Sequence, residues 1–216
     1  MGTEAPDQQR CQRRIGLTGG IASGKSSVGR VLAERYGLPV LDADVYAREA
    51  LAPGAAATRE VLAHFGQAVA QGGKPAAIDR AALGRVVFAD DGARAWLEAL
   101  VHPLVRQRFD AALAELAAAP VVVLMIPLLF EAGLDSLCSE TWLVDCDAPQ
   151  QLTRLMARDG LSADEARDRI AAQWPLARKR ALATVVLDNR GTPAALTEQL
   201  AALLSLGDRP ELETTW

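Results

Sequence analysis

The sequence predicts an α/β fold in which helices flank a parallel sheet of five strands, with a helical insertion and a helical lid added. Apolar runs rich in β-branched residues alternate with segments of helical periodicity, which is typical of a parallel sheet. Residues 55–118 are mostly helical in pattern and lack a convincing strand, so they predict the insertion. Residues 150–180 hold seven basic and four acidic residues, although the whole chain has a net charge of −4. This local excess of cations predicts the lid.

The first strand and the first helix enclose a phosphate loop. The strand is expected at 13–18, and apolar residues at helical spacing predict a helix at 25–36 that stops at Gly37. Between them, Gly19 is followed by four residues and then by Gly24, Lys25 and Ser26, which is the P-loop pattern in its required strand–loop–helix setting. The sequence therefore predicts a P-loop NTPase core.

The loop residues supply the candidate nucleotide site. Lys25 is expected to reach the β- and γ-phosphates, and the Ser26 hydroxyl is expected to help hold Mg²⁺. The remaining loop candidates for nucleotide binding are Gly20, Ala22, Ser23, Gly24 and Ser27.

Two carboxylates follow the second strand, which is expected at 38–41. Asp42 and Asp44 lie where ligands bind in open α/β sheets, and they share one face if the strand continues through them. Asp42 could then hold Mg²⁺ through water, and Asp44 could accept a proton from an attacking hydroxyl. A strand end with a helix N-cap is the alternative. The nearby phosphate loop favours the catalytic interpretation, and a short helix carrying Arg48 follows.

The insertion, 53–118, begins at Pro53-Gly54. Residues 72–75 predict a turn, and Asp79 starts a helix. His102-Pro103 interrupts the helical pattern, and Pro103 is suited to the first turn of a new helix. From the residues alone, His102 is more often structural than catalytic. Trp96, Trp142 and Trp174 are expected to pack in the core.

Three further strands are expected at 121–126, 142–146 and 185–187. Pro149 opens a helix on which Arg154 and Arg158 lie opposite the apolar side, free to face a ligand. A solvated helical face with intrahelical ion pairs is the alternative for these arginines. Ser162 begins a capping box, and Thr192-Pro193 caps the final helix.

Composition narrows the functional class. Half of the 216 residues are hydrophobic, which permits a sizeable core. A pI near 5.3 argues against nucleic acid as the main partner. The three cysteines, Cys11, Cys138 and Cys146, suggest neither a disulfide framework nor a zinc site. No signal peptide and no membrane-spanning run is evident, so we expect a cytoplasmic enzyme with flexible tails at 1–12 and 207–216.

Several motifs together resemble the dephospho-CoA kinase family over residues 13–205. They are the stretch from Gly16 to Ser26, Asp42-Ala-Asp44, His102-Pro103, Pro127-Leu-Leu-Phe-Glu131 and the segment from Gln173 to Asn189. The resemblance implies ATP-dependent phosphorylation of the ribose 3′-hydroxyl of dephospho-CoA with Mg²⁺. It also implies a nucleotide-binding core at 13–52, 119–148 and 180–206, a CoA-substrate-binding insertion at 53–118 and a mobile lid at 149–179.

Residue roles follow from the same resemblance. Asp44 matches the general base, and Arg154 and Asn189 match residues on the ATP side. The acceptor-substrate candidates are Asp44, Arg48, His102, Arg106, Pro127, Leu128 and Glu131. No nucleic-acid or membrane partner is expected, and the protein is expected to be a monomer or a small homo-oligomer.

Two residues depart from the family pattern, and two other functions stay open. Ala22 stands where glycine is frequent, and alanine is tolerable there only if its backbone angles are ordinary. Thr184 stands where an aspartate is frequent, which weakens any role assigned to 182–187. Another P-loop kinase acting on a nucleotide or a sugar is the main alternative. A GTPase-type switch is a weaker one, because no Asn-Lys-x-Asp motif is present.

Overall fold

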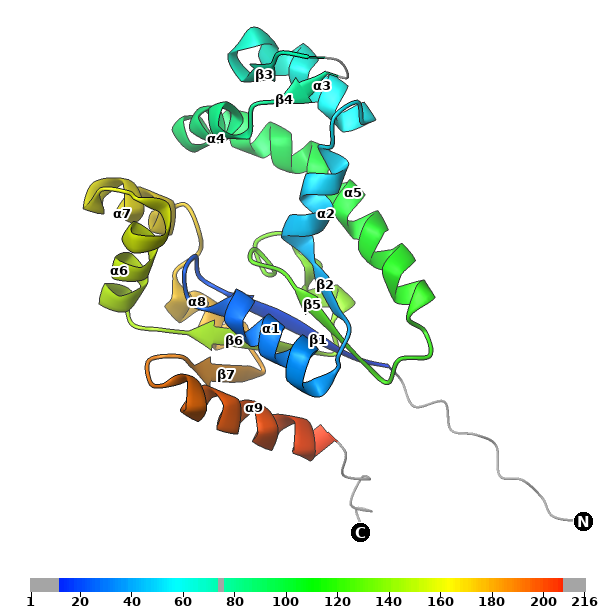
Figure 1. Cartoon of the computed structure of the whole chain (residues 1–216), viewed down its shortest axis with the longest axis vertical. Coiled ribbons are helices and arrows are strands. Elements are labelled where there is room, and N and C mark those ends of the chain that lie inside the picture. Colours follow the sequence, from blue (N-terminus) through cyan, green and yellow to red (C-terminus); the bar gives the residue numbers. More distant parts are fainter. Residues whose placement is uncertain (1–11, 74–75, 208–216) are drawn as a thin grey trace, which may run out of the picture.

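The structure, a computed structural model, describes residues 12–73 and 76–207. Its centre is a parallel five-stranded sheet with the order β2-β5-β1-β6-β7 (Figure 1). The strands are β1 (Arg13–Gly19), β2 (Val40–Asp42), β5 (Val121–Met125), β6 (Glu140–Asp145) and β7 (Val185–Asp188). The predicted α/β class and the number of strands are confirmed, and β6 begins two residues earlier than expected.

Helices cover both faces of the sheet, because each face carries its own apolar side chains. On β5, Val122 and Leu124 belong to the core beneath α5, whereas Val123 belongs to the core beneath α1 and α9. This alternation is the period-two pattern of a strand buried on both sides. The helices of the core are α1 (Lys25–Tyr36), α2 (Ala43–Ala50), α8 (Leu176–Leu182) and α9 (Pro193–Gly207).

The insertion stands above the C-terminal edge of the sheet and has a small core of its own (Figure 1). It contains α3 (Ala56–Phe65), the 3₁₀ helix η1 (Gly66–Val69), β3 (Ala70–Gln71), β4 (Ala77–Ile78), α4 (Arg80–Ala89) and α5 (Asp91–Glu115). The expectation that this segment lacks strands was wrong, because β3 and β4 pair antiparallel. Two-residue strands are too short to show alternation in a sequence. The turn expected at 72–75 lies partly outside the described residues.

The expected interruption at His102-Pro103 was also wrong, because α5 runs unbroken through Pro103. Proline removes one backbone hydrogen bond from a helix interior and costs about 3 kcal/mol. Tertiary packing outweighs this cost, since α5 buries Val101, Val105 and Phe109 against the sheet core. Local propensity is therefore overridden by burial at this site.

The last part of the chain follows the expected pattern of caps. The lid segment holds α6 (Ala148–Asp159) and α7 (Ala163–Ala171), and the Ser162–Glu165 capping box is present. Thr192 Oγ1 accepts a hydrogen bond from Ala195 N–H at the start of α9. Gln12, expected in a flexible tail, donates to the carbonyls of Leu116 and Ala119 at 2.7 and 3.0 Å. Of the expected tails 1–12 and 207–216, residues 1–11, with Cys11, and residues 208–216 lie outside the described residues, and Gly207 ends α9.

Candidate active site

The phosphate loop joins β1 to α1, and its backbone is shaped for an anion. Gly24 is the N-cap residue of α1 with a φ of 101°, and it has no side chain with which to cap the helix. The first N–H groups of a helix have no partner within it, so they remain free to bind a phosphate. A β-carbon at Gly24 would lie 2.0 Å from the Asn189 side-chain nitrogen. Glycine is therefore required both by the backbone angle and by this close approach.

Ala22 does not meet the condition of ordinary backbone angles. Its φ is 57°, and it is the one non-glycine residue with a positive φ among residues 12–73 and 76–207. A left-handed conformation costs an L-residue about 1–2 kcal/mol. The loop tolerates this cost because side chains from distant segments hold the neighbouring peptide groups in place.

Three amide side chains hold the loop. Ile21 N–H donates to Gln173 Oε1 at 2.9 Å, and the Ile21 carbonyl accepts from Gln151 at 2.8 Å. The Asn189 amide donates to the Ser23 carbonyl at 2.7 Å. No role was predicted for Gln151. The one feature of the sequence that could have indicated a role is that a polar residue stands on the helix opened by Pro149. Gln151 is buried in the structure and fixes the loop to α6.

The two carboxylates after β2 have different local roles. The strand ends at Asp42, which caps α2 and accepts a hydrogen bond from Asp44 N–H at 2.8 Å. The condition for a shared strand face is not met, because Asp44 lies in the first turn of α2. Asp42 thus takes the N-cap role that was the alternative, and Asp44 projects from the helix toward the phosphate loop.

Lys25 and Asp44 perturb each other across the cavity. The walls partly desolvate the solvent-accessible Asp44 carboxylate, which raises its pKa, while the nearby Lys25 charge acts in the opposite direction. Burial lowers the pKa of Lys25, which Asp44 and Asp42 partly counteract. Such shifts toward neutrality are typical of groups that exchange a proton or bind a charged ligand.

The loop and Asp44 line one cavity of about 480 Å³ together with residues far away in the sequence. These are Pro127 and Leu128 after β5, and Arg154, Arg158 and Gln173 from the lid segment. All of the predicted loop residues, Gly20, Ala22, Ser23, Gly24, Lys25, Ser26 and Ser27, line it as well. The cavity therefore contains a helix N-terminus, one lysine and two arginines, which suits a polyphosphate.

The guanidinium group of Arg154 indicates that the cavity binds an anion. Its Nη2 donates to the Asn189 carbonyl at 3.1 Å, whereas its buried Nη1 has no partner among the described residues. Arg158 Nε donates to Asp159 at 2.7 Å and is more exposed. A buried guanidinium nitrogen without an acceptor is costly, and a phosphate oxygen would satisfy it.

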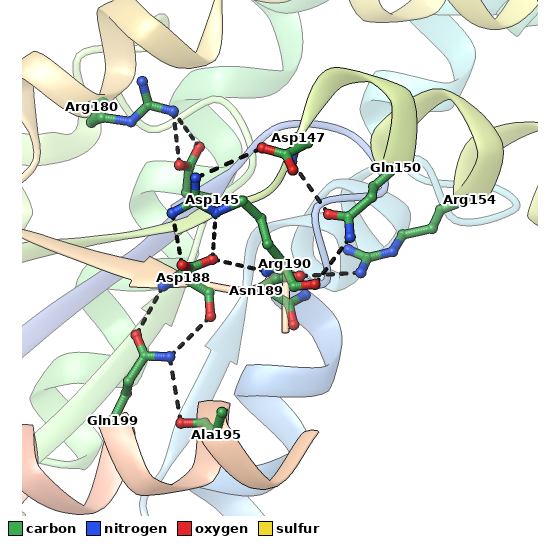
Figure 2. Close-up of polar contacts among 10 residues, drawn as sticks. All are labelled: Asp145, Asp147, Gln150, Arg154, Arg180, Asp188, Asn189, Arg190, Ala195 and Gln199. Atoms are coloured by element: carbon green, nitrogen blue, oxygen red, sulfur yellow. Dashed lines mark hydrogen bonds and ion pairs between the residues drawn. The ribbon is translucent and has the colours of Figure 1, made fainter. Parts of the chain in front are cut away.

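Polar contacts fix the strand-end segment that carries Asn189 (Figure 2). Asp145, at the end of β6, binds Arg180 with two hydrogen bonds of 2.9 and 2.7 Å. Asn189 N–H donates to the Asp145 carbonyl at 2.8 Å, and Arg190 binds Asp188. Asn189 is thereby held against the phosphate loop. Its predicted contact with ATP stays a prediction, because its amide group is engaged by Ser23.

Two further cavities meet the first one at Asp44. One, of about 230 Å³, is largely apolar and is lined by Ala47, Val101, Ile126 and Leu128, with His102 and Glu98 among its polar groups. The other, of about 390 Å³, is lined by Arg48 and Arg80 together with apolar residues of the insertion. Asp44 is thus the point from which a branched acceptor could extend in two directions.

The acceptor candidates divide into two groups. Pro127 and Leu128 line both the polyphosphate cavity and the apolar cavity, and His102 and Arg48 line one acceptor cavity each. Arg106 is exposed and lines none of these three cavities. Glu131 lines none of them either, because its carboxylate pairs with the buried Lys179 at 2.7 Å.

The donors for a metal ion are few. Within the part of the chain that the structure describes, no three His, Cys, Asp or Glu side chains gather as a metal site. The candidates are the exposed Ser26 hydroxyl at the start of α1 and the Asp42 carboxylate. This oxygen set fits Mg²⁺, which keeps water and phosphate ligands and needs one or two protein carboxylates.

Within residues 12–73 and 76–207, no helix is both long and apolar enough to cross a bilayer.

Comparison with known proteins identifies the family of the chain. A family profile described as dephospho-CoA kinase matches residues 13–194. A dephospho-CoA kinase of Synechococcus sp. (strain CC9605) is 62% identical over 208 residues, which cover 96% of this chain and 100% of the relative. The crystal structure of TT1252 from Thermus thermophilus has a TM-score of 0.75 at 41% identity, covering 90% of this chain and 97% of that one. A dephospho-CoA kinase from Campylobacter jejuni has a TM-score of 0.65 at 25% identity, covering 89% and 95%.

Proposed function

The chain belongs to the dephospho-CoA kinase family, and we propose that it transfers the γ-phosphoryl group of ATP to the ribose 3′-hydroxyl of dephospho-CoA. The products are coenzyme A and ADP, so the reaction is the last step of coenzyme A synthesis. The observation that carries this function is the junction at Asp44, where a polyphosphate cavity meets two cavities suited to a large acceptor.

The donor side holds ATP on the phosphate loop. Loop N–H groups and Lys25 bind the phosphates, and the unpartnered Arg154 nitrogen takes a phosphate oxygen. When bound, Mg²⁺ would supply positive charge that offsets the negative charge of the phosphates. Ser26 and, through water, Asp42 would hold the ion. The Asp42 oxygen that caps α2 is engaged, so its second oxygen is the one available.

Asp44 acts as the general base. It orients the 3′-hydroxyl and accepts its proton as the oxygen attacks the γ-phosphorus and the bond to the ADP oxygen breaks. Lys25 and the lid arginines stabilise the charge on the transferring group. The raised pKa of Asp44 makes its carboxylate a better proton acceptor than an ordinary aspartate.

The acceptor divides between the two cavities beside Asp44. The base and the 5′-diphosphate leave the ribose in different directions. The apolar cavity with His102 suits the flat adenine, whose edge needs a few polar partners. Arg48 and Arg80 suit the diphosphate, and the apolar residues beyond them suit the pantetheine arm. This division explains why the core carries the insertion 53–118.

The segment 149–179 serves as a lid. Arg169 of α7 lies over the ring of Phe88 of α4, with 5.5 Å between the guanidinium carbon and the ring centroid, so these two side chains join the lid to the insertion. Closure would exclude water, which otherwise competes for the γ-phosphoryl group. We place the enzyme in the cytoplasm as a monomer or small homo-oligomer without nucleic-acid or membrane partners, in line with its net charge of −4.

An acceptor panel tests the function. Purified enzyme with Mg²⁺–ATP is given dephospho-CoA, nucleosides, nucleotides and sugars, and ADP release is measured. The expected result is a strong preference for dephospho-CoA. Equal or better turnover of a nucleotide or a sugar would instead support another P-loop kinase, and tight selectivity for GTP over ATP would support a GTPase-type switch.

A further inference from the structure

A buried ion pair lies next to the active-site cavity, outside the groups that touch the substrates. Lys179 of α8 places Nζ 2.7 Å from Glu131 Oε1. The Lys179 side chain is 0% exposed and that of Glu131 is 15% exposed. The charge of Lys179 is close enough to Lys25 to contribute to the lowered pKa of Lys25.

The pair links three segments of the chain. Lys179 Nζ also donates to the Pro127 carbonyl at 3.2 Å, which accepts a second hydrogen bond from Thr18 Oγ1 at 3.1 Å. Glu131 Oε1 accepts a hydrogen bond from Trp174 N–H at 3.1 Å. The end of β1, the loop after β5 and the C-terminal end of the lid segment, at Trp174 and Lys179, are therefore joined at one place.

Stability alone does not account for this pair. Burying two charges costs free energy that their attraction often fails to recover, and apolar replacements are frequently as stable. The pair is also incompletely satisfied, because buried Glu131 Oε2 has no partner among the described residues. What an apolar pair could not do is donate a hydrogen bond to the Pro127 carbonyl.

The same segment contacts both walls of the cavity. Gln173 accepts from Ile21 N–H of the phosphate loop, and Lys179 donates to Pro127 on the acceptor side. We infer that Lys179 is a positioning residue that, with Glu131, fixes the Pro127–Leu128 wall relative to the phosphate loop, so that the acceptor hydroxyl stays aligned with the γ-phosphate. This inference depends on the proposed function for its substrate, although not for the anchoring itself.

Kinetics of Lys179→Met test the positioning. A misplacement of about 1 Å can cost about 100-fold in rate, so kcat is expected to fall by about 10- to 100-fold. The Kd of a non-hydrolysable ATP analogue should change by less than about threefold, because the groups on the phosphates remain. Arg94→Met, which removes the half-buried partner of the exposed Asp91 on α5, is the matched control and should leave both constants unchanged.

A double variant separates positioning from folding. Lys179→Met alone leaves a buried carboxylate uncompensated, whereas Lys179→Met with Glu131→Leu removes both charges. The double variant is expected to melt near the wild-type temperature and to remain slow, because nothing replaces the donor to Pro127. A double variant with wild-type kcat would overturn the inference. If neither variant folds, Thr18→Val is used instead, because it removes the other hydrogen-bond donor to the Pro127 carbonyl. An unchanged kcat in Thr18→Val would also overturn the inference.

Hydrogen exchange provides a readout that does not depend on the substrate. Ala132 and Leu134 donate backbone hydrogen bonds to Leu128 and Leu129 within the loop. In the double variant these amides should exchange faster, while those of β1 and β6 keep their protection. Unchanged exchange would refute the anchoring. If the wild type fails to use dephospho-CoA, the proposed function fails, and the exchange result still decides the role of Lys179.

Discussion

Asp44→Asn gives the most direct test of the catalytic assignment. The change keeps the shape of the side chain and removes its ability to accept a proton. It also leaves the cap of α2 intact, because Asp42 accepts from the Asp44 backbone N–H rather than from its side chain. The lost charge near the helix N-terminus is worth about 0.3–1 kcal/mol of stability. Asp44→Asn is therefore expected to fold and to bind ATP.

The expected kinetic effect is much larger than the effect on stability. A positioned general base contributes about 10²- to 10⁴-fold, which corresponds to about 2.7–5.5 kcal/mol of transition-state stabilisation. We expect kcat with dephospho-CoA to fall within this range while the Kd of an ATP analogue stays near the wild-type value. The acid limb of the pH–rate profile should also vanish, because the group that titrates there is gone.

The assay is steady-state ADP release across pH, with analogue binding measured by calorimetry. Asp42→Asn is the matched control, since asparagine is an equally good N-cap. It should keep the fold and the acid limb, and it should need more Mg²⁺ for half-maximal rate. A kcat for Asp44→Asn within about tenfold of wild type, with its acid limb retained, would refute the assignment of Asp44 as the base.

In the wild type, kcat/KM should begin to fall on the acid side at a pH above the pKa of an ordinary carboxyl, because the Asp44 pKa is raised. On the alkaline side it should fall at a pH below the pKa of an ordinary lysine, because the Lys25 pKa is lowered. A pH series in one buffer system measures both limbs. Asn189→Ala should weaken binding of the ATP analogue about fivefold, since a hydrogen bond worth about 1 kcal/mol that holds the phosphate loop is lost. Arg80→Met should raise the KM for dephospho-CoA about tenfold and leave the KM for ATP unchanged, measured by varying each substrate in turn. Ala22→Gly should change the free energy of unfolding by less than about 0.5 kcal/mol, because relief of backbone strain and added unfolded-state entropy nearly cancel; urea unfolding measures this.

Each of these expectations has a contradicting outcome. A flat pH profile would mean that neither group titrates in the free enzyme. Unchanged ATP affinity in Asn189→Ala would show that the loop keeps its shape without that contact. A higher KM for ATP in Arg80→Met would place the guanidinium on the donor side, and a gain of more than about 1 kcal/mol in Ala22→Gly would mean that the strain exceeds the ordinary cost of this conformation.

Local patterns were sufficient where the chemistry is local. The phosphate loop, the Ser162 capping box and the alternating apolar residues of the strands follow rules that span a few residues, and the structure has them. The helix break predicted at Pro103 is absent because the structure there depends on contacts that are distant in the sequence. The cost of proline is a local quantity, whereas the burial that outweighs it comes from contacts with β5 and α2.

The class of fold, the phosphate loop, the pair of carboxylates and the family could all be predicted from the amino-acid sequence. These properties depend on short-range periodicity and on motifs whose geometry is carried by the backbone. The tertiary structure alone decided that Asp42 caps a helix while Asp44 faces the cavity, that Gln151 and Gln173 hold Ile21, and that Glu131 pairs with Lys179. Apart from the Asp42 cap, each of these contacts joins residues that are far apart in the sequence. Its free energy depends on burial and on hydrogen-bond partners that come together when the sheet and the lid segment pack.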